Sequence, residues 1–353
     1  MSDSSHFNNR IKTTGEILKK IGWIDEFKGL WQGSLRLSPQ VLSRLKQSVL
    51  ITSSGASTRI EGSKLDDEEV ARLLRGLQTQ PPIGRDEQEV AGYADLLGRI
   101  FDNYKTFKLT EGQILQFHEI ELHFSEKDTA HKGKYKMKDN KVIMKKENGV
   151  EIVLFEPTPP WLVKKEMDDV LFWTNEELDK GQLHPLMITA NFIFEFLAIH
   201  PFSDGNGRLS RALTNLLMLK TGYSYIPYVS MEEIIEERRP DYYLSLRATQ
   251  NNHKTDHEDI TPWVNFFLNV LIEQTERARK IMESDQPEKL LSEKQLQIYQ
   301  SFKQKETLSK GEIFDLLGGV MPEVSIRQAL SRLIALKLIE RIGQGRTTRY
   351  QKL

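Results

Sequence analysis

The chain has 353 residues, more than one compact helical core needs and enough for two or three domains. Its 49 basic and 50 acidic residues give a formal net charge of −1, which excludes an overall positive field for nucleic acid or acidic membranes. It has no cysteine, which excludes disulfides and thiolate metal sites and predicts a cytoplasmic protein.

The N-terminal part of the sequence is predicted to be helical. Residues 1–10 are polar and lack the basic and apolar parts of a secretory signal, so we expect no export. Ser38 and Pro39 are typical of an N-cap and a first helical position, and apolar residues follow at helical spacing toward Ile60. Further helices are expected after Asp66, over residues 86–104 and after Thr110. We therefore define residues 1–102 as an N-terminal helical region.

The middle of the chain, residues 103–280, is also mainly helical. The exception is residues 133–144, where strand-like stretches on either side of Asp139-Asn140 predict a β-hairpin. A helix is expected over residues 161–178. Pro185 starts another, which is apolar on nearly every side and so predicted to be buried, and which ends at His200. This apolar stretch is shorter than the roughly 20 residues that cross a bilayer, so we expect no membrane contact.

The C-terminal part of the sequence predicts a separate domain. Residues 281–290 are polar and indicate a linker. Residues 291–353 predict three short amphipathic helices and then a hairpin, the order of a winged helix-turn-helix. From Pro287 to the end there are 12 Lys or Arg against 7 Asp or Glu, which modestly favours DNA binding. Winged helices also dock proteins or form dimers, so both readings stay open. The whole sequence predicts a mainly α protein.

The chemistry is concentrated in one segment, His200 to Arg211, with the sequence HPFSDGNGRLSR. A histidine has a reference pKa of about 6.5, so His200 at the end of a rigid helix is a candidate general base. A histidine that only ends the helix is the alternative. Helical periodicity resumes at Leu209, so Arg208 and Arg211, three residues apart, are expected on one face of the next helix.

The turn between the two helices predicts an anion site. Gly205 and Gly207 permit a tight turn around Asn206, and the main-chain N–H groups of such a turn, at a helix N-terminus, favour a phosphate. Asp204 would be unfavourable beside phosphate unless a cation lay between them, which indicates Mg²⁺. A plain turn is the alternative for this stretch alone. Together with the arginines, the turn indicates a metal-bridged polyphosphate nucleotide.

This segment resembles the Fic family, whose signature H-P-F-x-[D/E]-G-N-G-R-x-x-R is matched at every specified position. The resemblance implies a Fic-type helical core within residues 103–280 and transfer of AMP from ATP to a Ser, Thr or Tyr hydroxyl of a target protein or of the chain itself. It implies that His200 deprotonates the hydroxyl and that Asp204 binds Mg²⁺. The implied ATP-binding residues are Gly205, Asn206, Gly207, Arg208 and Arg211.

Residues 57–62 resemble the inhibitory motif of the same family, [S/T]-x-x-x-E-[G/N], with Ser57, Glu61 and Gly62 at the specified positions. The resemblance implies that Glu61 pairs with Arg211 and keeps the ATP γ-phosphate out of its productive place. Glu61 could also assist removal of AMP. The alternative is a surface glutamate before a glycine that ends a helix.

The resemblance also implies functions for a hairpin and for a pair of tyrosines. The hairpin at 133–144 corresponds to a flap that docks a target segment by strand pairing, although Lys136 stands where the family often has arginine. Tyr242 and Tyr243 correspond to a pair near the adenosine, with core packing as the alternative. The histidines of the segment from His118 to His123 are five residues apart, so they do not share a helix face and predict no zinc site.

Three functions remain open at this point. The first is an autoinhibited protein adenylyltransferase that uses ATP and Mg²⁺. The second is a DNA-binding transcription regulator with a nucleotide-sensing core. The third is an enzyme that transfers another phosphate-linked group. A homodimer that controls Glu61 is a further expectation.

Overall fold

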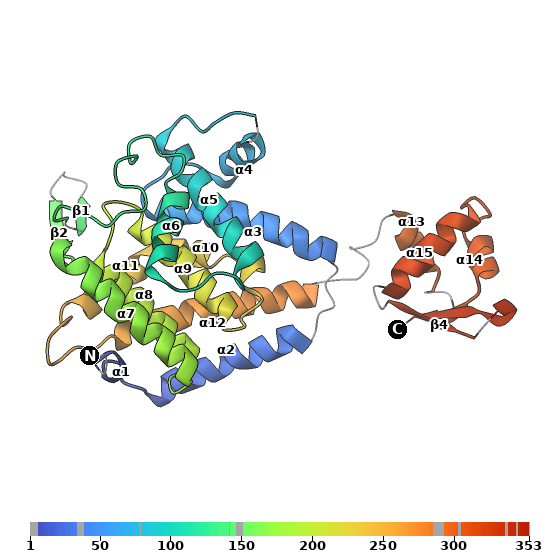
Figure 1. Cartoon of the computed structure of the whole chain (residues 1–353). Helices are drawn as coiled ribbons and strands as arrows, with labels where there is room; N and C mark the ends of the chain where they lie inside the picture. Colours follow the sequence, from blue (N-terminus) through green and yellow to red (C-terminus); the bar gives the residue numbers. More distant parts are fainter. Residues whose placement is uncertain are drawn as a thin grey trace. The chain divides into compact units, whose positions relative to one another are not determined.

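The computed structural model describes residues 6–33, 39–77, 79–140, 142–145, 151–284, 293–302, 305–335, 338–343 and 345–352. The chain forms two compact units, one of residues 1–32 and 45–278 and one of residues 33–44 and 279–353. The described elements up to residue 284 are α1 (His6–Asn9), α2 (Gly15–Gly33), α3 (Pro39–Ile60), α4 (Asp67–Gly76), α5 (Arg85–Asn103), α6 (Glu111–Glu121), β1 (Val142–Lys145), β2 (Glu151–Phe155), α7 (Pro160–Lys180), α8 (Pro185–Ile199), α9 (Asn206–Lys220), a 3₁₀ helix (Ile226–Tyr228), α10 (Met231–Glu237), α11 (Arg239–Gln250) and α12 (Thr261–Ser284). The mainly α fold is confirmed (Figure 1).

The helices begin where the sequence supplies caps. Asp66 accepts a hydrogen bond from the Glu69 N–H and Glu69 bonds back, which closes a capping box at the start of α4. Thr110 caps α6 with one hydrogen bond, which its side chain accepts from the N–H of Gln113. Pro185 occupies the first turn of α8. These side chains bind main-chain donors that would otherwise have no partner in the helix, which explains why the predicted starts are confirmed.

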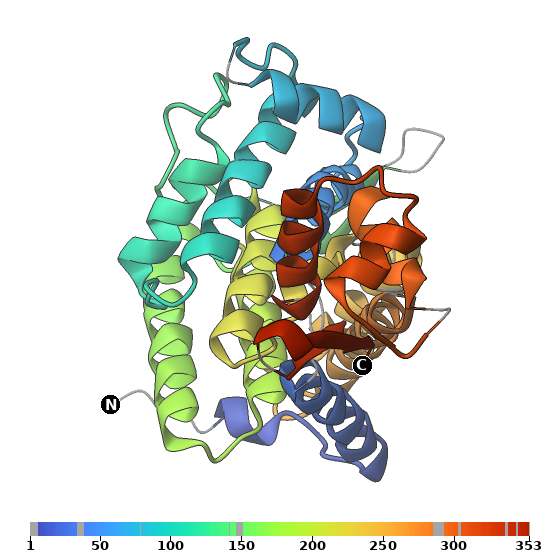
Figure 2. The same cartoon turned by 90° about the vertical axis from the view of Figure 1, so that its right-hand side faces the viewer.

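Helix α8 forms the centre of the first unit. Every residue from Leu186 to Ile199 is buried, as its apolar sequence predicts. It packs against α7 and against α9, and α9 also contacts α5 and α6 (Figures 1 and 2). This packing fixes the C-terminal end of α8 and the N-terminal end of α9, the two helix ends that carry the HPFSDGNGRLSR segment.

Helices α5 and α6 approach closely at Gly92. A β-carbon at this position would lie 1.8 Å from the main-chain oxygen of Glu121. We expect Gly92→Ala to lower the free energy of unfolding by about 1–3 kcal/mol, because the helices must separate to admit a methyl group. Denaturant unfolding measures this. Gly98→Ala on the same helix is the control, since its added methyl group would meet only Leu50 at 3.9 Å; equal stability of the two variants would contradict the expectation.

The predicted position of the β-hairpin is wrong. The strands that pair are β1 and β2, with Ile143 opposite Val153 and Met144 opposite Ile152, while residues 133–140 form no strand. The physical reason is that the main chain before β1 is bonded elsewhere: the Lys136 N–H donates to the carbonyl of Pro201. The hairpin therefore starts after Asn140, and residues 133–140 line the His200 segment instead. Residues 141 and 146–150 of this region lie outside the described residues.

The second unit contains α13 (Glu293–Ser301), β3 (Thr307–Leu308), α14 (Lys310–Leu316), α15 (Glu323–Ala335), β4 (Ile339–Ile342), a 3₁₀ helix (Gly345–Thr347) and β5 (Arg349–Lys352). Its strands form an antiparallel sheet in the order β3-β5-β4. Residues from all three helices and the sheet share one apolar core, while Arg327 and Gln328 of α15 are exposed. The winged helix-turn-helix and its DNA binding stay predictions.

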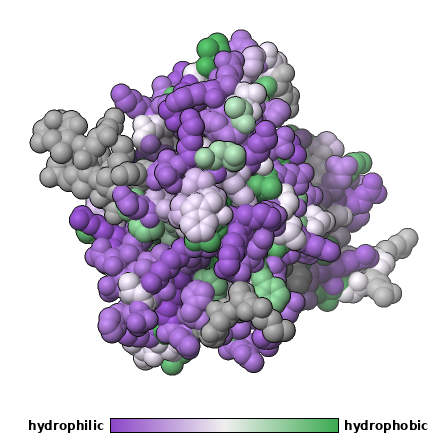
Figure 3. Space-filling view, turned by 60° about the vertical axis from the view of Figure 1, so that its left-hand side comes forward, coloured by the Kyte–Doolittle hydropathy of each residue, from purple (hydrophilic) through white to green (hydrophobic). Residues whose placement is uncertain are grey.

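The predicted linker at 281–290 begins inside α12, which extends to Ser284, and residues 285–292 lie outside the described part of the chain. None of the described helices combines the length and the apolar run that crossing a bilayer requires. Figure 3 shows a face on which hydrophilic residues dominate and apolar residues are scattered.

Candidate active site

His200 lies at the C-terminal end of α8 in a left-handed conformation, with φ 50° and ψ 60°. Its N–H donates to the carbonyl of Phe196, so the helix ends at this residue and the chain turns away. Burial and the nearby positive charge of Lys136 lower the pKa of His200 to about 4. The imidazole is therefore neutral at pH 7, the form that accepts a proton.

The loop after His200 is braced by Asn206. Its side chain accepts a hydrogen bond from the N–H of Phe202 at 2.9 Å and donates to the carbonyl of the same residue at 2.8 Å. The ring of Phe202 is buried and stacks on His118, with the centroids 3.8 Å apart. Asn206 thus shapes the loop with its side chain, and its N–H lies at the N-terminus of α9, where Gly205 has φ 83°. This arrangement provides a helix N-terminus for an anion.

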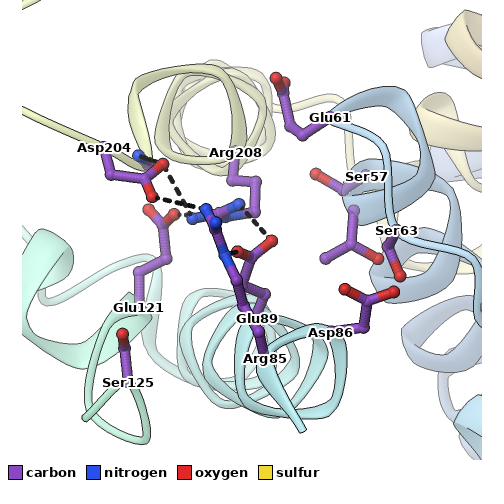
Figure 4. A network of polar contacts seen from close by, with 12 residues as sticks. Ser57, Glu61, Ser63, Arg85, Asp86, Glu89, Glu121, Ser125, Asp204 and Arg208 are labelled. Carbon is purple, nitrogen blue, oxygen red and sulfur yellow. Dashed lines mark hydrogen bonds and ion pairs between the residues drawn. The ribbon is translucent and has the colours of Figure 1, made fainter. Parts of the chain in front are cut away.

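Arg208 lies on the first turn of α9 between three carboxylates (Figure 4). Its Nε donates to Glu121 and its Nη1 to Glu89, each at 2.8 Å, and its Nη2 lies 3.6 Å from Asp204. Arg208 and Glu121 are both buried, and burial raises the pKa of Glu121 to about 8 against the opposing effect of Arg208. The Nη2 of Arg208 and the second oxygen of Glu121 have no hydrogen-bond partner among the described residues.

Asp204 has the properties that a magnesium ligand needs. Its side chain is one-third exposed; one oxygen accepts from the N–H of Gly205 at 2.6 Å and the other from Arg85 at 3.2 Å. A carboxylate that is reachable from solvent, beside a helix N-terminus that favours an anion, is an oxygen donor of the kind that Mg²⁺ prefers. The residues present therefore fit the predicted cation.

Arg211 is bound by the segment that the sequence analysis identified as inhibitory. Its Nε donates to the Ser57 hydroxyl and its Nη2 to the Ser57 carbonyl and to Glu61, at distances of 2.8 to 2.9 Å. The Nη1 of Arg211 has no partner in the described part of the chain. A β-carbon at Gly207 would lie 2.2 Å from Oε1 of Glu61, so this carboxylate rests directly on the first turn of α9. Glu61 thus lies where the helix N-terminus favours an anion.

These features match a known family. A profile of the Fic/DOC family matches residues 108–218. This part of the chain is a Fic/DOC family domain. Protein adenylyltransferase fic-1 of Caenorhabditis elegans is 32% identical over 112 residues, which are 32% of this chain and 20% of that protein. Protein adenylyltransferase Fic of Drosophila grimshawi is 36% identical over 95 residues, 27% of this chain and 17% of that protein. The chain thus spans about a fifth of the length of the curated relatives it matches.

Solved structures support the fold. A Fic family protein from Desulfovibrio desulfuricans G20 has a TM-score of 0.64 and 24% identity, with 98% of each chain covered. Fic-1 (aa134 - 508) from C. elegans has a TM-score of 0.59 and 21% identity, covering 76% of this chain and 72% of that one. At these identities the likeness concerns the fold alone.

Helix α3, which ends directly before Glu61, is anchored to α10 at two places. The Ser53 hydroxyl of α3 donates to Glu232 of α10, a fully buried carboxylate. Arg59 makes a bidentate ion pair with Glu236, at 2.6 and 2.9 Å. Helix α3 then ends at Ile60, and Gly62 has φ 110°. The ion pair of Glu61 and a glycine at the helix end therefore both occur in the structure.

The structure places the two tyrosines beside Arg211 and Glu61. Tyr242 is buried and contacts Trp263 and Phe266, as the core-packing alternative expects. The hydroxyl of Tyr243 donates to the carbonyl of Ile60 at 3.2 Å. Burial raises the pKa of Tyr242 well above its usual range, so its hydroxyl stays protonated. Contact of either ring with adenosine stays a prediction.

A second group of acidic and histidine side chains has a structural explanation. Atoms of Glu195, His253 and Glu258 lie within 4.8 Å of one another. Arg10 donates to Glu195 at 2.6 Å and to Glu258 at 2.9 Å, and a fixed guanidinium charge disfavours a metal ion in the same place. This buried network ties the N-terminal residues to α8.

The signature segment is also held from outside by residues that were not predicted from the sequence. Glu121 binds Arg208, and His118 contacts the carbonyl of Asp204 through Nε2 at 3.1 Å. These two residues are three apart and share one face of α6, a spacing visible in the segment that was considered only for zinc. Glu89 and Arg85 of α5 gave no signal of this kind, because their roles depend on how α5 packs against α9.

Proposed function

We propose that the chain is a protein adenylyltransferase, which transfers AMP from ATP to a hydroxyl of a protein. The observation that carries this proposal is that each of the two signature arginines is buried and keeps one nitrogen without a hydrogen bond among the residues that the structure describes. Both are buried, yet Nη2 of Arg208 and Nη1 of Arg211 lack a hydrogen-bond partner within the described residues. Buried donors are normally satisfied, so two guanidinium nitrogens without a hydrogen bond beside a helix N-terminus indicate an anionic ligand with several oxygens. The polyphosphate of ATP fits this chemistry.

His200 is proposed to be the general base. The neutral imidazole takes the proton of the Ser, Thr or Tyr hydroxyl, whose oxygen attacks the α-phosphorus of ATP. A new P–O bond to the target forms, the bond between the α-phosphorus and the bridging oxygen breaks, and pyrophosphate leaves. Arg208 and Arg211 stabilise the charge on the phosphates through positions that are fixed before ATP arrives. Autocatalytic labelling of the chain's own hydroxyls would follow the same steps.

Asp204 is proposed to hold Mg²⁺ together with phosphate oxygens. The ion would reduce the repulsion between the phosphates and this carboxylate. Arg85 now bonds to Asp204, so it would have to release at least one carboxylate oxygen when the cation binds.

Glu61 is proposed to inhibit the transfer. Its carboxylate occupies Arg211 and the first turn of α9, the place expected for the γ-phosphate. A role of Glu61 in removing AMP, by orienting water, is the alternative.

The hairpin of β1 and β2 is proposed to dock the target. Its two strands pair with each other, so each has an outer edge to which an extended target segment could add by main-chain pairing. Such pairing recognises a strand more than a side chain.

The donor label tests the reaction type. The Glu61→Gly variant is incubated with a candidate target and ATP that carries the label on either the α- or the γ-phosphate. AMP transfer predicts that the α label stays on protein after denaturation and that the γ label does not. Retained γ label would instead indicate phosphate transfer, and no retained label from either donor would leave the nucleotide-sensing alternative.

A further inference from the structure

The main chain around His200 is held by an outside segment. A left-handed conformation is uncommon for a residue with a side chain, so the turn needs support from its surroundings. The carbonyl before His200, that of Ile199, accepts from Nζ of Lys136 at 3.3 Å. The carbonyl after it, that of Pro201, accepts from the Lys136 N–H at 2.9 Å. One residue thus bonds on both sides of the candidate base.

Asn140 extends this support by one residue. Its Nδ2 donates to the carbonyl of Phe202 at 3.2 Å, and its Oδ1 accepts from Nζ of Lys136 at 2.7 Å. Residues 136–140 therefore bond to three carbonyls around His200, and we name this segment the His200 brace. The His200 brace lies within residues 133–144, where the sequence predicted a hairpin.

Lys136 is an unusual residue for a purely structural brace. It is 3% exposed, and its ammonium has no carboxylate within ion-pair distance among the residues that the structure describes. Burial lowers its pKa to about 8, although Asp139 and Glu166 act in the opposite direction. Burying a charge without a paired carboxylate is unfavourable, and a neutral donor could make the same hydrogen bonds more easily.

We propose that Lys136 is a positioning residue for His200: its ammonium and main-chain N–H, with the amide of Asn140, hold the left-handed turn and place a fixed positive charge beside the imidazole. This inference rests on the proposed function, in which His200 must be a neutral base at a defined place. The charge disfavours the imidazolium, and the hydrogen bonds fix the main chain that carries the ring. The lysine at the position where related flaps often carry arginine would therefore serve the base instead of the target.

The other charges that face His200 act against Lys136. They are Glu61, the residue after α3, and Asp204 in the loop between His200 and α9, and both favour the protonated imidazole. In the Glu61→Gly variant the balance shifts further toward the neutral form. All variants below therefore share that background when activity is compared.

The activity test compares Lys136→Met and Lys136→Arg with their Glu61→Gly parent. For Lys136→Met we expect kcat to fall about tenfold or more with KM for ATP unchanged, because a misplaced base slows the chemical step but leaves the phosphate site intact. In the pH profile of its kcat, the acidic limb should lie at higher pH than in the parent. Lys136→Arg should keep the acidic limb of the parent. Lys127→Met is the matched control, since Lys127 is exposed and lies outside the brace, and it should leave every value unchanged.

A titration of His200 tests the inference without the reaction. The imidazole signals of histidine-labelled protein are followed by NMR against pH, with His200→Ala used to assign the signal. Lys136→Met should make His200 titrate at higher pH than in the parent protein. Asn140→Ala, which keeps the charge but removes one bond to the loop, should lower kcat with a smaller change in the titration. Circular dichroism checks that each variant is folded.

The outcomes separate the two proposals. If kcat falls and the His200 titration moves, the role of Lys136 is supported. An unchanged titration in folded Lys136→Met overturns it, whether kcat falls or not, because Lys136 would then be only a structural anchor. If His200 titrates at a different pH but kcat stays the same, the proposal that Lys136 positions His200 for catalysis is overturned. If the parent itself transfers no AMP, the proposed function fails, and the titration alone decides whether Lys136 acts on His200.

Discussion

At an ATP concentration below saturation, the Glu61→Gly variant should transfer AMP about ten- to a hundredfold faster than the unaltered chain. This increase is expected because Arg211, which is buried, donates a hydrogen bond to Glu61 at 2.8 Å. A hydrogen bond to a charged group contributes about 1.5–3 kcal/mol, and each 1.4 kcal/mol corresponds to a factor of ten. ATP must overcome this interaction to reach Arg211, and the glycine removes it. The initial rate of α-label transfer to protein measures the effect.

Two further variants make this test specific. Glu61→Gln keeps the size of the side chain but loses its charge, so its rate should lie between those of the unaltered chain and the glycine variant. Glu68→Ala changes an exposed glutamate of α4 and should have no effect. Equal or slower labelling by Glu61→Gly would contradict inhibition. If Glu61 removes AMP instead, pre-labelled target should lose its label with the unaltered chain and keep it with the variant.

Replacing His200 by alanine in the Glu61→Gly background should lower the transfer rate about 10²- to 10⁴-fold, the usual contribution of a general base. Affinity for ATP should stay nearly the same, because the phosphates are proposed to bind Arg208 and Arg211, and neither arginine bonds to His200 in the described structure. Isothermal titration with a non-hydrolysable ATP analogue separates the two quantities. A rate within threefold of the parent would exclude His200 as the base.

The pH dependence gives a second check on His200, with a defined sign. Burial and Lys136 lower its pKa to about 4, so the base is already neutral at pH 5 and the rate should not fall between pH 7 and pH 5 through this group. His123→Ala is the matched control, since His123 is exposed and should be replaceable without loss. A fall in the transfer rate centred near pH 6.5, the ordinary histidine pKa, would contradict the lowered pKa of His200.

Local chemistry made much of the fold predictable. Caps such as Asp66 and Thr110 and the proline at residue 185 act within one helical turn, so their effect can be read from the sequence. Helix α2 was also predictable, although no prediction covered it: its buried residues Ile17, Ile21, Ile24, Phe27 and Trp31 recur at spacings of three and four. The hairpin was misplaced because the bond from Lys136 to Pro201 joins residues 65 positions apart in the sequence.

The candidate site divides in the same way. The segment from His200 to Arg211 is contiguous, so its residues could be named from the sequence. Glu61 could be named because its motif is also contiguous. Glu121, Glu89 and Lys136 reach the site through the packing of separate elements, so their contacts with Arg208 and with the main chain around His200 could not be predicted from the sequence.

The anchoring of α3 bears on how the proposed inhibition by Glu61 would depend on ATP concentration. Ser53 and Arg59 bond to α10 and keep the helix in place, whereas the Glu61 side chain follows the last helical residue and is one-third exposed. The carboxylate can therefore leave Arg211 by rotating its own bonds while the helix stays docked. Inhibition would then depend on nucleotide concentration, and a high ATP level would raise the rate without any partner. Glu61→Gly should differ from the unaltered chain mainly in the ATP concentration needed for half-maximal rate.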